Sequence, residues 1–193
     1  MQSSRKGLNL WLTWAMLGAL AFLVMKIEFP LMPGFDYLKF DLSDALIAIS
    51  TMALGPLSGF MITLIKVLLS LIFAGFNPIS LVGDIAAFLA TLAYIYPIYF
   101  ISKKHHEKFW YQIGGILVGT ISLTVIMSLA NYFFLMPMYI TMIGFKLNST
   151  ILKYVVSVVV PFNILKGLIN GAVVLLLART FLPTFVKFVK KHY

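Results

Sequence analysis

Apolar residues in this chain occur in long, nearly continuous stretches, and polar residues gather in the short connectors between them. A helix that crosses a membrane needs about 20 predominantly apolar residues. The pattern predicts six transmembrane helices, at residues 8–26, 43–54, 57–74, 80–101, 110–136 and 153–178. We therefore expect an all-α integral membrane protein in which residues 1–193 form a single six-helix membrane domain.

Prolines mark the ends of several predicted helices. Pro30 follows the first helix, Gly55-Pro56 ends the short second one, and Pro161 interrupts the sixth near its start, because proline lacks the N–H that a helix needs. The first helix follows Arg5 and Lys6 as a signal peptide would. No small-residue cleavage site comes after it, so we expect a retained membrane span.

The composition supports this interpretation. Hydrophobic residues make up 61% of the chain and charged residues 11%, and the mean hydropathy is +0.99. A soluble domain is about 45–50% apolar and about 25% charged, so an ordinary soluble enzyme is excluded. The chain has no cysteine, which excludes disulfides and thiol chemistry. No nucleotide-binding or catalytic motif is present, and the length leaves no room for a separate ATPase domain.

The positive charges indicate orientation. Fifteen Lys and Arg residues against six Asp and Glu give a net charge of +9. With six crossings, one side carries Arg5, Lys6, Lys103, Lys104, Lys108, Arg179, Lys187, Lys190 and Lys191. The other side carries only Lys26, Lys39, Lys146 and Lys153. Since basic residues concentrate on the cytoplasmic side of membrane proteins, we expect both termini in the cytoplasm and no nucleic-acid partner.

The first outer connector is unusually polar for a membrane edge. It reads Leu38-Lys39-Phe40-Asp41 and continues into Leu42-Ser43-Asp44 at the start of the second helix. One interpretation is a solvated loop in which Ser43 or Asp44 caps that helix. The other is a loop that folds over an externally facing binding site.

The fifth predicted helix ends in an amide among aromatic residues, with Asn131 and Tyr132 followed by an aromatic run to Tyr139. An asparagine in a span can simply bond to a neighbouring helix, and interfacial aromatic residues are usually anchors. The same combination also suits a flat, partly apolar ligand.

The sixth helix carries a buried lysine between two amides. Asn163, Lys166 and Asn170 are spaced three and four apart, which places them on one helix face. A lysine within a span costs about 2.5–3.5 kcal/mol on insertion scales, so it must face protein or water. The alternative is a salt-bridged lysine, or one that reaches the membrane surface with its long side chain.

Two further features have structural and functional interpretations. Lys66 is a second intramembrane lysine, and we expect a structural ion pair with Asp84 rather than catalysis. Ala15, Gly18 and Ala19 in the first helix are small enough to let another helix approach closely. That helix can belong to the same bundle or to a partner protein.

Three segments resemble a known family: residues 38–44 with 55–59, residues 131–139, and residues 161–167. The chain resembles the substrate-binding S-components of energy-coupling factor (ECF) vitamin transporters, and among them the riboflavin-specific members. The resemblance covers nearly the whole chain and implies the S-component fold in a bacterial cell membrane. The small-residue pattern of the first helix is not continued at Leu23.

The resemblance also implies the function and the partners. Riboflavin would be a transported ligand and not a cofactor, and metal and catalytic residues would be absent. ATP hydrolysis would belong to the ATPases EcfA and EcfA', which join the S-component through the transmembrane coupling protein EcfT. Ala15, Gly18 and Ala19 would dock on EcfT, and the S-component would topple in the lipid bilayer to carry the vitamin inward.

The chemistry of the candidate ligand-binding residues agrees with a flavin. These residues are Leu38, Lys39, Phe40, Asp41, Asn131, Tyr132, Tyr139, Asn163, Lys166 and Asn170. Asparagine donates and accepts at once, as the uracil-like flavin edge requires, and lysine donates to a carbonyl or a ribityl hydroxyl. Aromatic rings can pack on the flavin ring. The alternatives are FMN or another vitamin such as thiamine, a carrier that works alone, or a lipid-modifying membrane enzyme.

Overall fold

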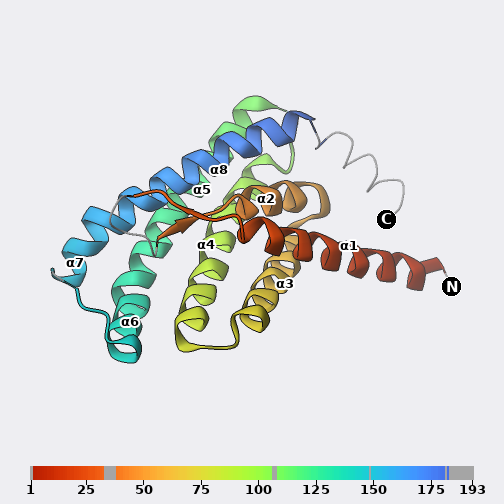
Figure 1. The fold of residues 1–193 in the computed structure, drawn as a ribbon. Helices are drawn as coiled ribbons and strands as arrows, with labels where there is room; N and C mark the ends of the chain where they lie inside the picture. The colour runs from red at the N-terminus through yellow and green to blue at the C-terminus, as the bar shows by residue number, and fades with distance from the viewer. Residues whose placement is uncertain (1, 33–37, 106–107, 148, 181, 183–193) are drawn as a thin grey trace.

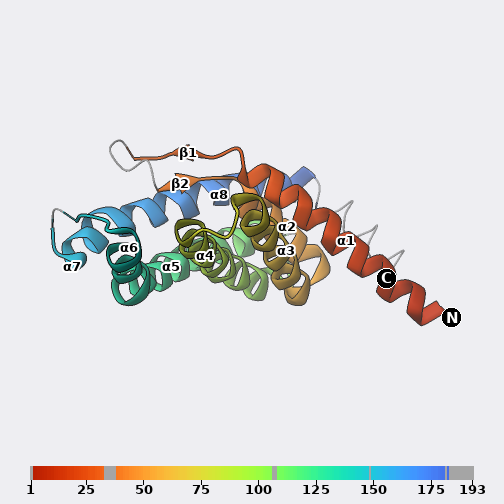
Figure 2. The same cartoon turned by 60° about the horizontal axis from the view of Figure 1, so that its bottom comes forward.

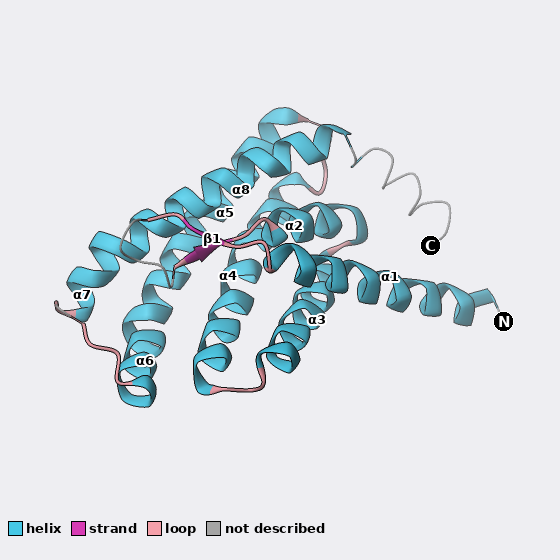
Figure 3. Ribbon diagram, in the orientation of Figure 1, coloured by secondary structure: helices cyan, strands magenta, loops and turns pink. Residues whose placement is uncertain are grey.

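The protein is a bundle of helices with one short pair of strands (Figures 1 and 3). The computed structural model describes residues 2–32, 38–105, 108–147, 149–180 and 182. The elements are α1 (Gln2–Met25), β1 (Phe29–Pro30), β2 (Lys39–Phe40), α2 (Ser43–Leu54), α3 (Pro56–Ala74), α4 (Pro78–Ser102), α5 (Phe109–Ala130), the π-helical turn η1 (Asn131–Leu135), α6 (Met136–Ile143), α7 (Ile151–Tyr154), the π-helical turn η2 (Val155–Val159) and α8 (Val160–Thr180).

Every predicted span is helical, but not every helix is long enough to cross a membrane. Among the described residues, five helical stretches have the required length and apolarity: Leu8–Met25, Pro56–Ala74, Pro78–Ser102, Phe109–Met142 and Ile151–Thr180. The second predicted span, α2, is the exception: it has 12 residues, fewer than the roughly 20 that a span needs. The helical architecture is confirmed, whereas six crossings and cytoplasmic termini stay predictions.

The fifth helix does not end at residue 136 as predicted, but continues through Pro137 to the end of α6. The turn before this proline is π-helical, and the Met136 N–H donates to the Asn131 carbonyl five residues earlier. Pro161 is likewise preceded by η2, so it does not interrupt the sixth helix. A proline leaves the carbonyl four residues before it without a partner, and in both helices that carbonyl lies in the widened turn.

The connector after α1 forms a two-stranded antiparallel ribbon across one face of the bundle (Figure 2). Phe29 pairs with Phe40, and their rings pack edge to face with centroids 5.2 Å apart. Lys39 forms an exposed ion pair with Glu28. Because Phe40 is only 1% exposed, the ribbon is anchored in the protein rather than free in solvent.

The start of α2 is stabilised differently from the prediction. Neither Ser43 nor Asp44 caps the helix; instead, the Asp41 carboxylate accepts a 2.8 Å hydrogen bond from the Ser43 N–H. This leaves the Asp44 side chain, which is 1% exposed, available to interact with other helices.

The core lies where α2, α4, α5 and α8 meet. Helix α2 packs on α3, α4 and α8, and α5 packs on both α4 and α8. Gly167 of α8 lies so close to α5 that an added Cβ would come within 2.6 Å of the Thr120 hydroxyl oxygen. The Tyr94 hydroxyl of α4 donates a 2.9 Å hydrogen bond to the Gly167 carbonyl, so three helices converge at this glycine.

Candidate functional site

Four helices contribute to a buried cluster of charges and hydroxyls. Asp44 of α2 lies between the lysines of α3 and α8: its Oδ1 is 3.3 Å from Lys66 Nζ, and its Oδ2 is 3.0 Å from Lys166 Nζ. Thr91 of α4 donates to Asp44 Oδ1 at 2.6 Å and accepts from Lys66 at 3.0 Å. Lys66 also donates to Ser43 at 3.1 Å. We call these five residues the charge cluster.

The expected partner of Lys66 was wrong, since the structure pairs it with Asp44 and not with Asp84. Thr91 is the α4 residue that lies at the level of Lys66. Asp84 comes seven residues before it, about 10 Å along the helix at 1.5 Å per residue, and interacts with Ser70. The expectation of a structural ion pair at Lys66 is confirmed with a different acid.

The predicted polar face of the sixth helix is confirmed. Asn163, Lys166 and Asn170 are 3%, 7% and 1% exposed, while Ile164 and Leu165 between them are exposed. Lys166 does not extend to the surface, because its ammonium pairs with Asp44 inside the bundle. Lys166 is therefore a salt-bridged lysine. The salt bridge does not exclude a ligand, because an ammonium has three N–H groups and the ion pair does not use all of them.

The two amides predicted near a ligand lie on helices that pack against each other. The side chain of Asn131 donates to the Met127 carbonyl and that of Asn163 to the Val159 carbonyl, each at 2.8 Å. Each bond uses one of the two N–H groups of the amide, so the other N–H and the oxygen can serve a ligand. Both amides are buried beside a π-helical turn.

The structure brings parts of the first connector to these helices. Asn170 donates a 3.4 Å hydrogen bond to the Asp41 carbonyl, and no partner of its own oxygen lies among the described residues. Leu38 and Tyr139 pack against the same apolar cluster, whose buried members are Met136, Tyr154, Val155, Val158 and Val159. The connector, η1 with α6, and η2 therefore meet at one end of the bundle.

The three remaining predicted residues of the connector and η1 differ in exposure: the side chains of Lys39 and Tyr132 are exposed, and that of Phe40 is buried. Lys39 is exposed and paired with Glu28. Tyr132 is 41% exposed and packs edge to face on Phe133. Phe40 is buried, with Phe29 as its aromatic neighbour. The structure thus brings Leu38 together with Tyr139, and Asp41 together with the polar face of α8.

The small residues of α1 face in two directions. Gly18 faces α3, where an added Cβ would lie 2.6 Å from Ile65 Cγ2, so it serves packing within the bundle. Ala15 and Ala19 are exposed. The Ala15–Ala19 pair therefore presents a flat surface that another helix can approach.

Sequence reasoning overlooked Asp44, Ser43 and Thr91 as parts of the site. One of the two interpretations of this segment made Ser43 or Asp44 a helix cap, although a carboxylate within an apolar helix can also neutralise a buried lysine. The available signal was Lys166, an intramembrane lysine to which no acid had been assigned. Thr91 gave none, because a threonine in an apolar helix usually bonds to its own backbone.

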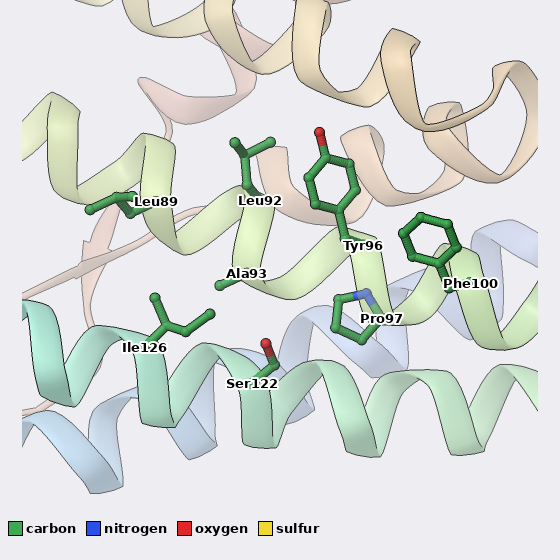
Figure 4. A pocket seen from close by; sticks show the side chains of 8 residues that line it. All are labelled: Leu89, Leu92, Ala93, Tyr96, Pro97, Phe100, Ser122 and Ile126. Carbon is green, nitrogen blue, oxygen red and sulfur yellow. The ribbon is translucent and has the colours of Figure 1, made fainter.

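A separate apolar groove of about 380 Å³ lies between α4 and α5 (Figure 4). Leu89, Pro97 and Ile126 line it, and Tyr96 and Ser122 supply its hydroxyl groups. None of its lining residues is charged. It therefore offers a polar ligand two hydroxyl groups and no charge, and the charge cluster is the better candidate.

Apolar helices that enclose two ammonium groups, a carboxylate and several amides define a multi-pass membrane protein with an internal polar site. The model of the family "ECF transporter, substrate-specific component" matches residues 12–178. A solved structure of the S component of a bacterial ECF transporter superimposes with a TM-score of 0.76 at 34% identity, covering 93% of this chain and 98% of that one. The chain belongs to the S-component family of ECF transporters.

Two relatives have names that specify a substrate. The riboflavin transporter RibU of Staphylococcus aureus (strain TCH60) is 35% identical over 178 residues, covering 91% of each chain. The riboflavin transporter FmnP of Bacillus subtilis (strain 168) is 35% identical over 158 residues, covering 80% of this chain and 82% of that one. The predicted family and fold are confirmed, and the protein is a transporter component of the membrane rather than an enzyme.

Proposed function

We propose that this protein binds riboflavin at the outer face of the membrane and delivers it to the cytoplasm together with an ECF ATPase module. The observation that carries the proposal is Lys166, an ammonium group buried on the same helix face as two amides. The names of the relatives support riboflavin as the ligand. The energy would come from ATP hydrolysis by partner subunits.

The flavin ring would lie between the amides and the apolar cluster. Asn131 and Asn163 would each offer an N–H and a carbonyl oxygen to the uracil-like edge, which alternates donors and acceptors. The apolar dimethylbenzene end would pack against Leu38 and Tyr139. A charged hydrogen bond from Lys166 to a ring carbonyl or ribityl hydroxyl would contribute roughly 1.5–3 kcal/mol.

The first connector would meet the ribityl chain. Leu38 and Asp41 lie beside the helices that carry the amides, and their backbone groups can bond hydroxyls. Asn170, with an oxygen that has no partner among the described residues, would accept from the ligand or help to hold Asp41. Phe40, which is buried and directly precedes Asp41, would line this site, whereas the exposed Lys39 and Tyr132 would join it only if the connector or η1 rearranges when the ligand binds.

The proposed topology has six crossings with both termini in the cytoplasm. The short α2 would complete its crossing with help from neighbouring helices, since eight of its twelve residues are buried in the bundle. Ala15 and Ala19 would dock on the coupling protein EcfT, which also binds the ATPases EcfA and EcfA'. Gly18 would contribute indirectly by keeping α1 close to α3.

A purification and a titration test the ligand. We expect the protein to copurify with riboflavin, to be yellow, and to quench the fluorescence of added riboflavin. Lys166→Ala should weaken binding about tenfold or more, which corresponds to about 1.4 kcal/mol or more. Lys146→Ala is the matched control, because Lys146 is an exposed lysine in a connector. A colourless protein that does not quench riboflavin contradicts the proposal.

The same titration separates the alternative ligands. A preference for FMN would indicate a phosphate-binding group in the site, and binding of thiamine would indicate partners for a cation. Uptake assays in vesicles test the transport mode. We expect no uptake by the purified chain alone and uptake when the ATPase module is added, so uptake by the chain alone would identify a solitary carrier.

A further inference from the structure

The two lysines of the charge cluster differ in how many of their N–H groups are used. Lys66 has three acceptors, Ser43 at 3.1 Å, Thr91 at 3.0 Å and Asp44 at 3.3 Å, which match its three N–H groups. In the part of the chain that the structure describes, Lys166 has Asp44 as its one ion-pair partner. Lys66 is therefore saturated, whereas Lys166 keeps N–H groups available for a ligand.

Asp44 is held from one side and pairs with Lys166 on the other. Its Oδ1 accepts from Thr91 at 2.6 Å and from Lys66, so this oxygen is fixed by α3 and α4. Its Oδ2 is directed to Lys166. At 1% exposure the carboxylate cannot exchange these partners for water.

We propose that Asp44 is the positioning residue of the ligand-binding site: it fixes the ammonium group of Lys166, while Lys66 and Thr91 fix Asp44. The inference rests on the proposed binding of riboflavin through Lys166. Lys66 would never touch the ligand. Its function would be to orient the carboxylate and to neutralise it.

This arrangement explains why two lysines share one carboxylate. A free lysine side chain has several rotatable bonds, and ordering it upon binding reduces affinity by about 0.5–1.5 kcal/mol. An ion pair with a rigid carboxylate orders Lys166 before the ligand arrives. The carboxyl group of Asp41 also lies within electrostatic range of Lys166, so the two acids balance the two lysines.

A double-mutant cycle tests the proposal, because residues that act through one another do not have additive effects. The first change is Asp44→Leu with Lys66→Met, which removes one charge of each sign from the cluster and leaves Lys166 as its remaining ion, without its acid. Replacing a buried ion pair by apolar residues of similar size is often neutral for stability. The second change is Lys166→Met. Riboflavin affinity is measured for all four proteins by fluorescence quenching.

We expect the double variant and Lys166→Met each to weaken binding about tenfold or more, and the triple variant to bind within about threefold of Lys166→Met alone. If the affinity loss of the triple variant equals the product of the losses of the double variant and of Lys166→Met, Asp44 has a merely structural role and the proposal is overturned. A double variant that binds within about threefold of the wild type would also overturn it. Failure of the wild-type protein to bind riboflavin would instead refute the proposed function.

Two further variants keep the test decisive. If the double variant does not fold, Asp44→Glu replaces it, because this substitution keeps the charge and shifts the carboxylate by one methylene. Asp44→Glu alone should weaken riboflavin binding about fivefold or more. Combined with Lys166→Met, it should weaken binding little beyond the effect of Lys166→Met. Wild-type affinity of Asp44→Glu would overturn the proposal. The control is Trp14→Phe, which removes a buried 2.7 Å hydrogen bond to Ser58, eight residues or about 12 Å along α3 from Lys66. It should lower stability without changing affinity by more than about threefold.

Discussion

Thr91 connects Asp44 and Lys66 through one hydroxyl group, so Thr91→Val should destabilise the bundle more than the loss of an ordinary threonine. The variant loses a 2.6 Å hydrogen bond to a carboxylate and a 3.0 Å hydrogen bond from an ammonium. Bonds to charged groups contribute about 1.5–3 kcal/mol each. Because one hydroxyl makes both hydrogen bonds and its neighbours can adjust, we expect the free energy of unfolding to decrease by about 3 kcal/mol, the lower limit of the two contributions added together.

Thermal unfolding of the purified protein in detergent measures this loss. For a chain of this size, about 3 kcal/mol corresponds to a decrease in Tm of about 6–12 °C. Thr63→Val is the matched control, because Thr63 is equally buried but its hydroxyl donates only to the Gly59 carbonyl of its own helix. A decrease for Thr91→Val within about 1 °C of that for Thr63→Val would refute the assigned role of the charge cluster.

Three further substitutions test the packing and the surface. Tyr94→Phe removes the 2.9 Å hydrogen bond to the Gly167 carbonyl. It should decrease the free energy of unfolding by about 1 kcal/mol and lower Tm by about 2–4 °C. Gly18→Val should cost about 1–3 kcal/mol in the same assay, because the new Cβ would lie 2.6 Å from Ile65 and would separate α1 from α3. Glu28→Gln breaks only an exposed ion pair and should change the unfolding free energy by less than about 0.5 kcal/mol; a larger loss would show that the ribbon depends on this pair.

The helices could be predicted from sequence because long apolar segments leave few alternatives in a membrane. The limits of the short α2, Ser43–Leu54, follow from a polar connector before it and Gly55-Pro56 after it. Pro137 was misleading, because a proline predicts a helix end while a π-helical turn can accommodate it. The two π-helical turns η1 and η2 also contact each other in the bundle, which no local pattern reveals.

The polar face of α8 could be predicted because spacing along one helix determines which side chains share a face. The partner of Lys66 could not be predicted in this way. Asp44 and Asp84 are both acids in or beside neighbouring helices, and the choice between them depends on how far each helix slides along the next. Only the assembled bundle shows that Thr91, not Asp84, is level with the lysine.

The charge cluster also has a consequence for biosynthesis. Asp44 and Lys66 lie on consecutive helices, so they can neutralise each other while the rest of the chain is still being made. Lys166 lies on α8, more than 120 residues after Asp44, and is synthesised long after its partner. A buried lysine is costly to insert into a bilayer, and the preformed α2–α3 hairpin presents a carboxylate to receive it. We therefore expect insertion of α8 to be aided by the acid in α2, and loss of that acid to reduce the yield of assembled protein.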